Sequence, residues 1–84
     1  MGGVLNPNNA RNGNMNEHTM RQFLNRKPFE PFTVVMSSGD RHLVSHPENA
    51  ILTKTKIVIA IPEEDSFAIC ALLHVVAVET QQPA

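Results

Sequence analysis

The chain has 84 residues and a formal net charge of −1, with four Phe, no Trp or Tyr, and one Cys. This length allows one domain, and a folded core of about 65 residues buries only roughly 60% of its unfolded surface. The isolated domain should therefore be marginally stable unless something adds to its core. The balanced charge argues against a strong non-specific nucleic-acid binder, and a single cysteine, Cys70, excludes both an internal disulfide and a cysteine zinc cluster.

Two further exclusions concern the membrane and export. The longest apolar run, residues 68–78, is interrupted by His74 and is too short to span a bilayer. The N-terminus shows no basic region followed by an apolar stretch, which is the pattern of a secretory signal. We therefore expect a cytoplasmic protein with no membrane contact.

The two ends of the chain differ in composition from the middle. Residues 1–14 contain five Asn, three Gly and one Pro, a composition that cannot bury a core and predicts a disordered tail. A more ordinary sequence begins at Met15, so residues 1–14 are either a native tail or an extension upstream of a true start at Met15. We expect a single helix-plus-barrel domain over residues 15–79 and a polar C-terminal tail over residues 80–84.

The first predicted element is a helix over about residues 16–26. Asn14 and Glu17 have the spacing of a capping box, in which an Asn accepts from first-turn N–H groups and a Glu lies three residues on. The apolar residues then recur at the spacing of one helical face: Met20, Phe23 and Leu24. Pro28 should end the helix, because the residue before a proline avoids the helical region.

After Pro28 the apolar period changes from that of a helix to that of strands. Short strand-like segments recur with turn signals between them, which indicates a small antiparallel barrel or sandwich. The segments are residues 32–36, 41–45, 50–53, 56–61, 66–70 and 75–79. Ser38-Gly39 forms the first hairpin turn, because Gly tolerates the positive φ that such turns need. We predict a mainly β fold, a small five-stranded antiparallel barrel with one N-terminal α-helix.

Two Pro-Phe pairs, Pro28-Phe29 and Pro31-Phe32, join the helix to the strands. The prolines hold the chain extended with little entropy to lose, so Phe29 and Phe32 can fold inward, one under the helix and one into the barrel. The alternative is an exposed aromatic platform, but such platforms usually have flanking basic residues, and only Arg26 and Lys27 flank this one.

The string PFEPFTVVMSSGDRHLVSHPE resembles a family of short bacterial proteins found in planctomycete-type genomes. The pattern is Pro-Phe-x-Pro-Phe, a strand, Gly, and then His-Pro-Glu, and the resemblance covers about residues 20–79. The family has no established activity to imply.

The order of elements is also similar to the Sm-like fold, which includes the bacterial Sm-like RNA chaperone, and an SH3-like barrel fits the strand count nearly as well. In Sm-like rings the fourth strand of one subunit pairs with the fifth of the next, which implies an external partner for residues 56–61. The chaperone's Tyr-Lys-His uridine signature would fall near residues 67–71, which read FAICA. The resemblance therefore implies the fold and not the RNA site.

Candidate chemical groups are few, and we predict no catalytic residue, cofactor or metal. His42 and His46 on one strand would lie about 13 Å apart, too far to share a metal. Cys70 and His74 could approach on a helix, but Cys70 lies in an apolar run, where a free Cys is typically inert. The acidic residues 63–65 fit a solvated turn.

Two functional hypotheses follow. The first is a non-enzymatic interaction module that self-associates through strand edges or binds a protein partner, because a marginal core and an apolar strand both call for a partner. Its self-association strand is Ile57, Val58, Ile59, Ala60 and Ile61. The alternative is an Sm-like RNA-binding ring, whose candidate phosphate contacts are Arg21, Arg41, Lys54 and Lys56.

Overall fold

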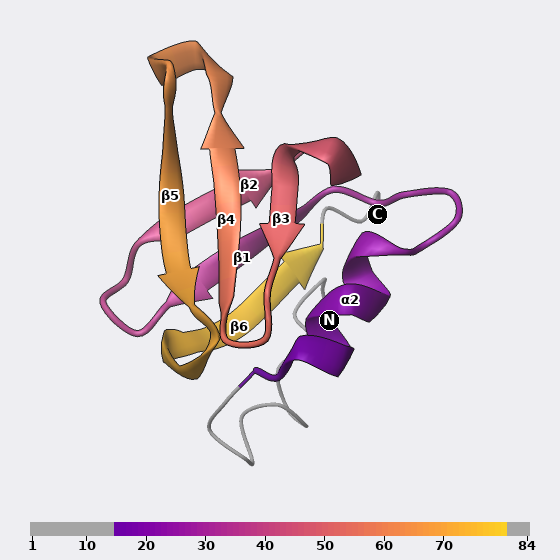
Figure 1. The fold of residues 1–84 in the computed structure, drawn as a ribbon, viewed down its shortest axis with the longest axis horizontal. Coiled ribbons are helices and arrows are strands. Elements are labelled where there is room, and N and C mark those ends of the chain that lie inside the picture. Colours follow the sequence, from indigo (N-terminus) through magenta and orange to yellow (C-terminus); the bar gives the residue numbers. More distant parts are fainter. Residues whose placement is uncertain (1–14, 81–84) are drawn as a thin grey trace.

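The structure is a computed structural model, and it describes residues 15–80. One α-helix, α2 (Glu17–Leu24), precedes six strands (Figure 1). The strands are β1 (Phe32–Met36), β2 (Arg41–Val44), β3 (Ala50–Leu52), β4 (Lys56–Ile61), β5 (Ser66–Ala71) and β6 (Val75–Thr80). Three short 3-10 turns, η1 (Pro47–Asn49), η2 (Pro62–Glu64) and η3 (Leu72–His74), lie between β2 and β3, β4 and β5, and β5 and β6.

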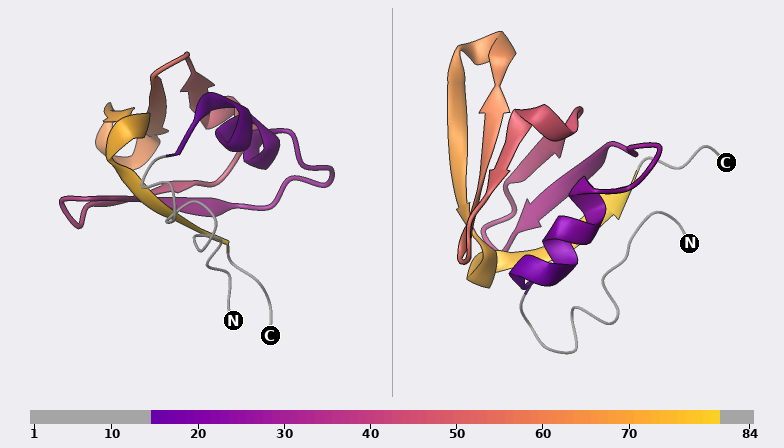
Figure 2. Two further views of the ribbon diagram at one scale, coloured as in Figure 1. Left: turned by 90° about the horizontal axis from the view of Figure 1, so that it is seen from below. Right: turned by 45° about the vertical axis from the view of Figure 1, so that its right-hand side comes forward.

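The strands form two three-stranded antiparallel sheets, ordered β2-β1-β6 and β3-β4-β5. Figure 1 views the molecule with β3-β4-β5 in front of the other sheet, and the two further views show α2 beside β3 at the open side between the sheets (Figure 2). The mainly β fold with one N-terminal helix is thus confirmed. Within residues 15–80 no strand pairing closes the two sheets into a barrel, so the five-stranded barrel stays a prediction.

One sequence feature explains why six strands appear where the prediction has a barrel of five. Pro47 begins η1 directly after β2, and proline has no N–H to donate to a strand ladder. As a result β2 pairs only with β1, while β3, after η1, pairs only with β4. The two short strands therefore act as one interrupted strand that links the sheets.

The N-cap of helix α2 lies two residues later than the predicted capping box placed it. The N-cap is Asn16, whose side-chain oxygen accepts a hydrogen bond from the Thr19 N–H at 2.8 Å. Asn14 lies outside the described residues. Glu17 is the first helical residue, and it pairs with Arg21 one turn on at 2.9 Å. The helix ends at Leu24, before the predicted end at residue 26.

The core lies between the two sheets and under α2. Met20 and Phe23 from the helix, Phe32 and Val34 from β1, and Ile57 and Ile59 from β4 are all buried. The Phe32 ring lies 5.5 Å from that of Phe23 and 6.0 Å from that of Phe29, with tilted planes, and both separations fall in the range of favourable aromatic pairs. The two Pro-Phe pairs are therefore a corner whose aromatics fold inward, as predicted, with Phe32 between the other two rings.

The first hairpin turn is longer than the predicted two residues. Residues 37–40 connect β1 to β2, and Gly39 adopts φ +98°, a left-handed conformation that favours glycine. Its N–H donates to the Met36 carbonyl at 2.8 Å, and the Met36 N–H donates to the Asp40 carbonyl at 2.8 Å. The prediction that Gly39 supplies the positive φ is correct.

Candidate functional site

The outer side of the sheet β3-β4-β5 is apolar, although that side faces solvent. Alternation along the strands directs Ile57 and Ile59 into the core and the residues between them outward. Ile51, Phe67 and Ile69 are 64%, 63% and 61% exposed, and the half-buried Val58 lies between Ile51 and Ile69 as the direct cross-strand neighbour of both. We call Ile51, Val58, Phe67 and Ile69 the outer patch.

The outer patch is unusual for an antiparallel sheet, which normally has one side on the core and a polar side in water. In Figure 1 this sheet is seen from its outer side, and neither Figure 1 nor Figure 2 shows a described helix or strand in front of it. Cross-strand pairs of large apolar side chains stabilise a sheet, but here much of their surface remains in water.

Strand β5 is one of the two end strands of the same sheet, and its outer edge is free. The Leu72 N–H donates to the Thr55 carbonyl at 2.8 Å, and Ala71 lies opposite Lys56 in the ladder. Because hydrogen-bonded and non-hydrogen-bonded pairs alternate in an antiparallel ladder, the N–H and C=O groups of Phe67, Ile69 and Ala71 point away from β4. No strand among residues 15–80 lies on that side of β5.

This topology corrects the predicted self-association strand. Residues Ile57, Val58, Ile59, Ala60 and Ile61 lie on β4, which is the central strand and pairs with β3 on one side and β5 on the other. Strand β4 therefore has no free backbone edge in this structure. Of the predicted residues, Ile57 and Ile59 are in the core, and Val58 belongs to the outer patch. KIVIAI is apolar on both sides because one side packs in the core and the other belongs to the outer patch.

Opposite charges lie at the two ends of the sheet. Lys54 and Lys56 are exposed at the β3–β4 turn, and Lys56 pairs with the last residue of β5. Glu63, Glu64 and Asp65 are exposed at the β4–β5 turn, beside the first residue of β5. Two of these acidic residues, Glu63 and Glu64, line a cleft on the side of the sheet that faces β2.

The four predicted phosphate contacts are not brought together as one unpaired group. Arg21 pairs with Glu17 on α2, and Arg41 pairs with Glu79 across from β2 to β6. Lys54 and Lys56 are neighbours at the β3–β4 turn, where the Lys56 ammonium lies 3.3 Å from the Thr55 hydroxyl. Only the two lysines are adjacent to the outer patch.

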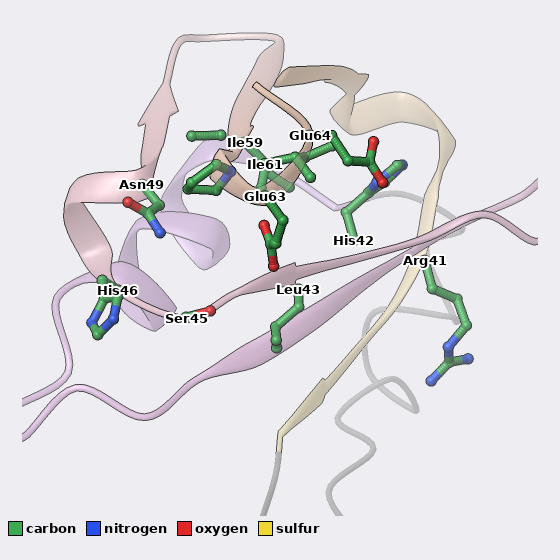
Figure 3. Close-up of a pocket in the computed structure, with 12 residues that line it drawn as sticks. Arg41, His42, Leu43, Ser45, His46, Asn49, Ile59, Ile61, Glu63 and Glu64 are labelled. Atoms are coloured by element: carbon green, nitrogen blue, oxygen red, sulfur yellow. The ribbon is translucent and has the colours of Figure 1, made fainter. Parts of the chain in front are cut away.

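A polar cleft of about 540 Å³ lies between β2 and the β4–β5 turn (Figure 3). His42, His46 and Asn49 line it from one side, and Glu63 and Glu64 from the other. Figure 3 shows Glu63 pointing from η2 towards β2. Within residues 15–80 no three His, Cys, Asp or Glu side chains are placed to hold one metal ion.

The Cys70–His74 pair lies at a second, smaller cavity of about 300 Å³, together with Asp40. Cys70 is on β5 and buried, and His74 is on η3 rather than on one helix with it. Burial raises the pKa of the Cys70 thiol, and the nearby Asp40 charge raises it further. A raised pKa lowers the thiolate fraction at neutral pH, which is the opposite of what a cysteine nucleophile needs.

The chain matches no protein-family model, no curated protein and no solved structure. Among the described residues, no helix is long and apolar enough to cross a membrane. The candidate site therefore rests on geometry alone: an apolar outer patch, a free β5 edge, and charges at the ends of both. Sequence reasoning missed Phe67 and Ile69, because the apolar run around Cys70 does not show which residues face outward.

Proposed function

We propose that this chain is a cytoplasmic, non-enzymatic interaction module that self-associates through the free edge of β5. The observation that carries the proposal is that unpaired backbone groups and exposed apolar side chains occur on the same strand. An unpaired, apolar edge strand is a template for pairing with another chain. The free thiol of Cys70 fits a reducing compartment.

Antiparallel pairing of β5 with the β5 of a second copy gives every outward-pointing backbone N–H and C=O group of Phe67, Ile69 and Ala71 a partner. In the register that places Ile69 opposite itself, Phe67 faces Ala71 of the other copy. The N–H and C=O groups of all three residues then find partners. The same register keeps outward-facing side chains on one side of a continuous sheet, because directly opposite residues share a face. Such a two-fold contact is the commonest symmetry of homo-oligomers.

The substitution Ala71→Pro tests the edge. Ala71 has φ −71° and ψ 129°, a conformation that proline adopts, and its N–H points away from β4. Proline therefore removes an edge donor without removing a bond inside the chain. We expect the dissociation constant, measured by sedimentation velocity across protein concentration, to rise at least about tenfold, because each copy leaves a carbonyl unpaired.

Ala71→Val is the matched control, because it changes the side chain and keeps the N–H. It should associate like the parent chain. Circular dichroism should show that both variants remain folded. If Ala71→Pro is folded and associates as strongly as Ala71→Val, the edge of β5 is not the contact.

An Sm-like RNA-binding ring is the second candidate, and the strand order supports it. The two sheets are ordered β2-β1-β6 and β3-β4-β5. If β2 and β3 are taken as one interrupted strand, the order becomes β6-β1-β2/β3-β4-β5, which resembles that of a small five-stranded barrel of the Sm-like or SH3-like kind. In such a ring the β5 edge would meet the β6 edge of a neighbour. The ion pairs that occupy Arg21 and Arg41 argue against a phosphate-binding surface.

RNA titration separates the two candidates. A ring that binds RNA through Lys54 and Lys56 should show affinity that falls steeply as salt is raised, because bound phosphates release counterions. The variant with Lys54→Ala and Lys56→Ala should lose that affinity while keeping the mass of the parent. An interaction module shows no salt-dependent RNA binding in either form.

A further inference from the structure

We propose that the polar cleft between β2 and the β4–β5 turn binds an extended peptide segment that carries a lysine or arginine side chain. The segment adds as a strand to the free edge of β2, and its basic side chain meets the carboxylates of Glu63 and Glu64. This surface is distinct from the edge of β5, through which the proposed self-association occurs.

The first wall of the cleft is the edge of β2. Strand β2 is an end strand of its sheet, and no described strand pairs with it on the side away from β1. The Met36 N–H donates to the Asp40 carbonyl at 2.8 Å, so these two residues form a hydrogen-bonded pair of the ladder. Because hydrogen-bonded and non-hydrogen-bonded pairs alternate, the backbone N–H and C=O groups of Arg41 and Leu43 point away from β1.

Arg41 and Leu43 line the cleft with their backbone. Both residues border it, yet Figure 3 shows their side chains pointing away from it. The Arg41 guanidinium pairs instead with Glu79 on β6. Among the described residues that line the cleft, Arg41 is the one Lys or Arg. The β2 wall therefore offers backbone donors and acceptors and brings no ammonium or guanidinium group into the cleft.

The second wall is acidic and comes from η2. Within residues 15–80 neither Glu63 nor Glu64 takes part in an ion pair or a side-chain hydrogen bond, and Glu63 points towards β2 (Figure 3). The half-buried Ile61 lies on the same side of β4 as the core residues Ile57 and Ile59, and it adds apolar surface to this wall. The cleft of about 540 Å³ thus combines a free strand edge with two unpaired carboxylates.

The occupant follows from these two walls. A free strand edge takes up an extended segment through main-chain hydrogen bonds, and the surroundings of the added strand select its side chains. Such a strand lies about 4.8 Å from β2, on the side where Glu63 and Glu64 form the opposite wall. Their charge attracts an ammonium or guanidinium group and repels a carboxylate. The complementary partner is therefore a basic extended segment.

The test is an NMR titration with a designed peptide, Thr-Val-Lys-Val-Thr, with blocked ends. Its β-branched residues favour an extended backbone. A second peptide has Glu in place of Lys. Two more carry backbone N-methyl groups, one on both Val residues and the other on the Lys and the last Thr. Only alternate amides of an added strand face β2, so one N-methylated peptide loses the bonding amides and the other keeps them.

The protein variants separate the charge from the fold. The double variant Glu63→Gln and Glu64→Gln removes both charges and keeps the shape of the side chains. The matched control is Glu48→Gln, at an exposed glutamate on η1 that does not line the cleft. Circular dichroism should show that all forms remain folded.

We expect the Lys peptide to shift the amide signals of Arg41, Leu43, Glu63 and Glu64. Its dissociation constant should rise about fivefold in the double Gln variant, as expected for partly exposed ion pairs, and stay unchanged in Glu48→Gln. The Glu peptide should bind the parent chain more weakly than the Lys peptide. One N-methylated peptide should lose binding, and the other should bind like the unmodified peptide.

The contrary outcomes are equally specific. If the Lys peptide causes no shifts at millimolar concentration, or if the Lys and Glu peptides bind equally, the inference is overturned. If both N-methylated peptides bind like the unmodified one, the cleft takes a cation alone and strand addition is wrong. Shifts confined to Phe67, Ile69 and Ala71 would place the peptide on β5, which overturns the cleft inference and leaves the edge proposal standing. A parent chain that is monomeric at every concentration overturns the edge proposal, and the titration still decides on the cleft.

Discussion

Phe32 is the residue on which the joint between helix and sheets should depend most. It is fully buried, it begins β1, and its ring contacts both Phe23 of α2 and Phe29 of the Pro-Phe corner. Phe32→Ala removes the ring that all three segments share. Phe32→Leu keeps most of the apolar volume and loses the aromatic contacts, so it gives a graded measure of the same joint.

The expected magnitudes follow from burial. Truncating a buried Phe to Ala costs about 3–5 kcal/mol, from the lost transfer energy and the cavity left behind. A domain of about 65 residues has a free energy of unfolding of about 3–10 kcal/mol, so Phe32→Ala should remove a large part or all of it. Phe32→Leu should cost about 1–2 kcal/mol, because an imperfect apolar replacement loses shape complementarity and aromatic pairing. For a domain of this size, that lowers Tm by about 4–15 °C.

Thermal unfolding followed by circular dichroism is the assay, at a protein concentration low enough that self-association does not add to stability. Phe67→Leu is the control, because it makes the same chemical change at a position that is 63% exposed. It should change the free energy of unfolding by no more than about 0.5 kcal/mol. If Phe32→Leu has the same Tm as Phe67→Leu, the aromatic corner does not hold the helix to the sheets.

Three further predictions concern single positions. Because burial raises the pKa of Cys70 in the folded chain, the unfolded chain loses that proton first. The free energy of unfolding should therefore be unaffected below the ordinary titration range of a thiol and fall as pH rises through it; urea titrations should show this slope in the parent and not in Cys70→Ala. Gly39→Ala places a side chain at φ +98°, where nothing lies within 4 Å, so backbone strain alone should cost about 1 kcal/mol or more in a urea titration. Asn16→Ala removes the acceptor for the Thr19 N–H and should lower the free energy of unfolding by about 1 kcal/mol, whereas Asn16→Asp should keep the acceptor. If the two variants have the same Tm, the cap contributes nothing to stability.

The elements with a clear period were predictable from the sequence. The spacing of Met20, Phe23 and Leu24 gave the helix, and the alternation around Val34 gave the first strand, because both patterns follow from which side faces the core. The cap was misplaced because Asn14 and Asn16 are both good N-cap residues, and sequence does not show which one has the extended conformation before the first turn.

The pairing partners were not predictable in the same way. KIVIAI is apolar on both sides, and the sequence alone does not distinguish a strand with a free edge from a central strand with an apolar outer side. The pairing of β4 with both β3 and β5 decides between these. It moves the free edge to β5, where the run FAICA had shown only that Cys70 is in an apolar setting. The charges at the ends of the sheet also became a pattern only once the strands were paired.

Hydrogen exchange of the β5 amides, followed by NMR at rising protein concentration, tests self-association most directly. The amides of Ala68 and Cys70 point towards β4 and should be protected at every concentration, so they serve as the internal reference. The amides of Phe67, Ile69 and Ala71 point to the free edge. We expect them to exchange rapidly in dilute solution and to become protected as the chain assembles. Rapid exchange of these three amides at all concentrations, with Ala68 and Cys70 protected throughout, would contradict pairing through β5.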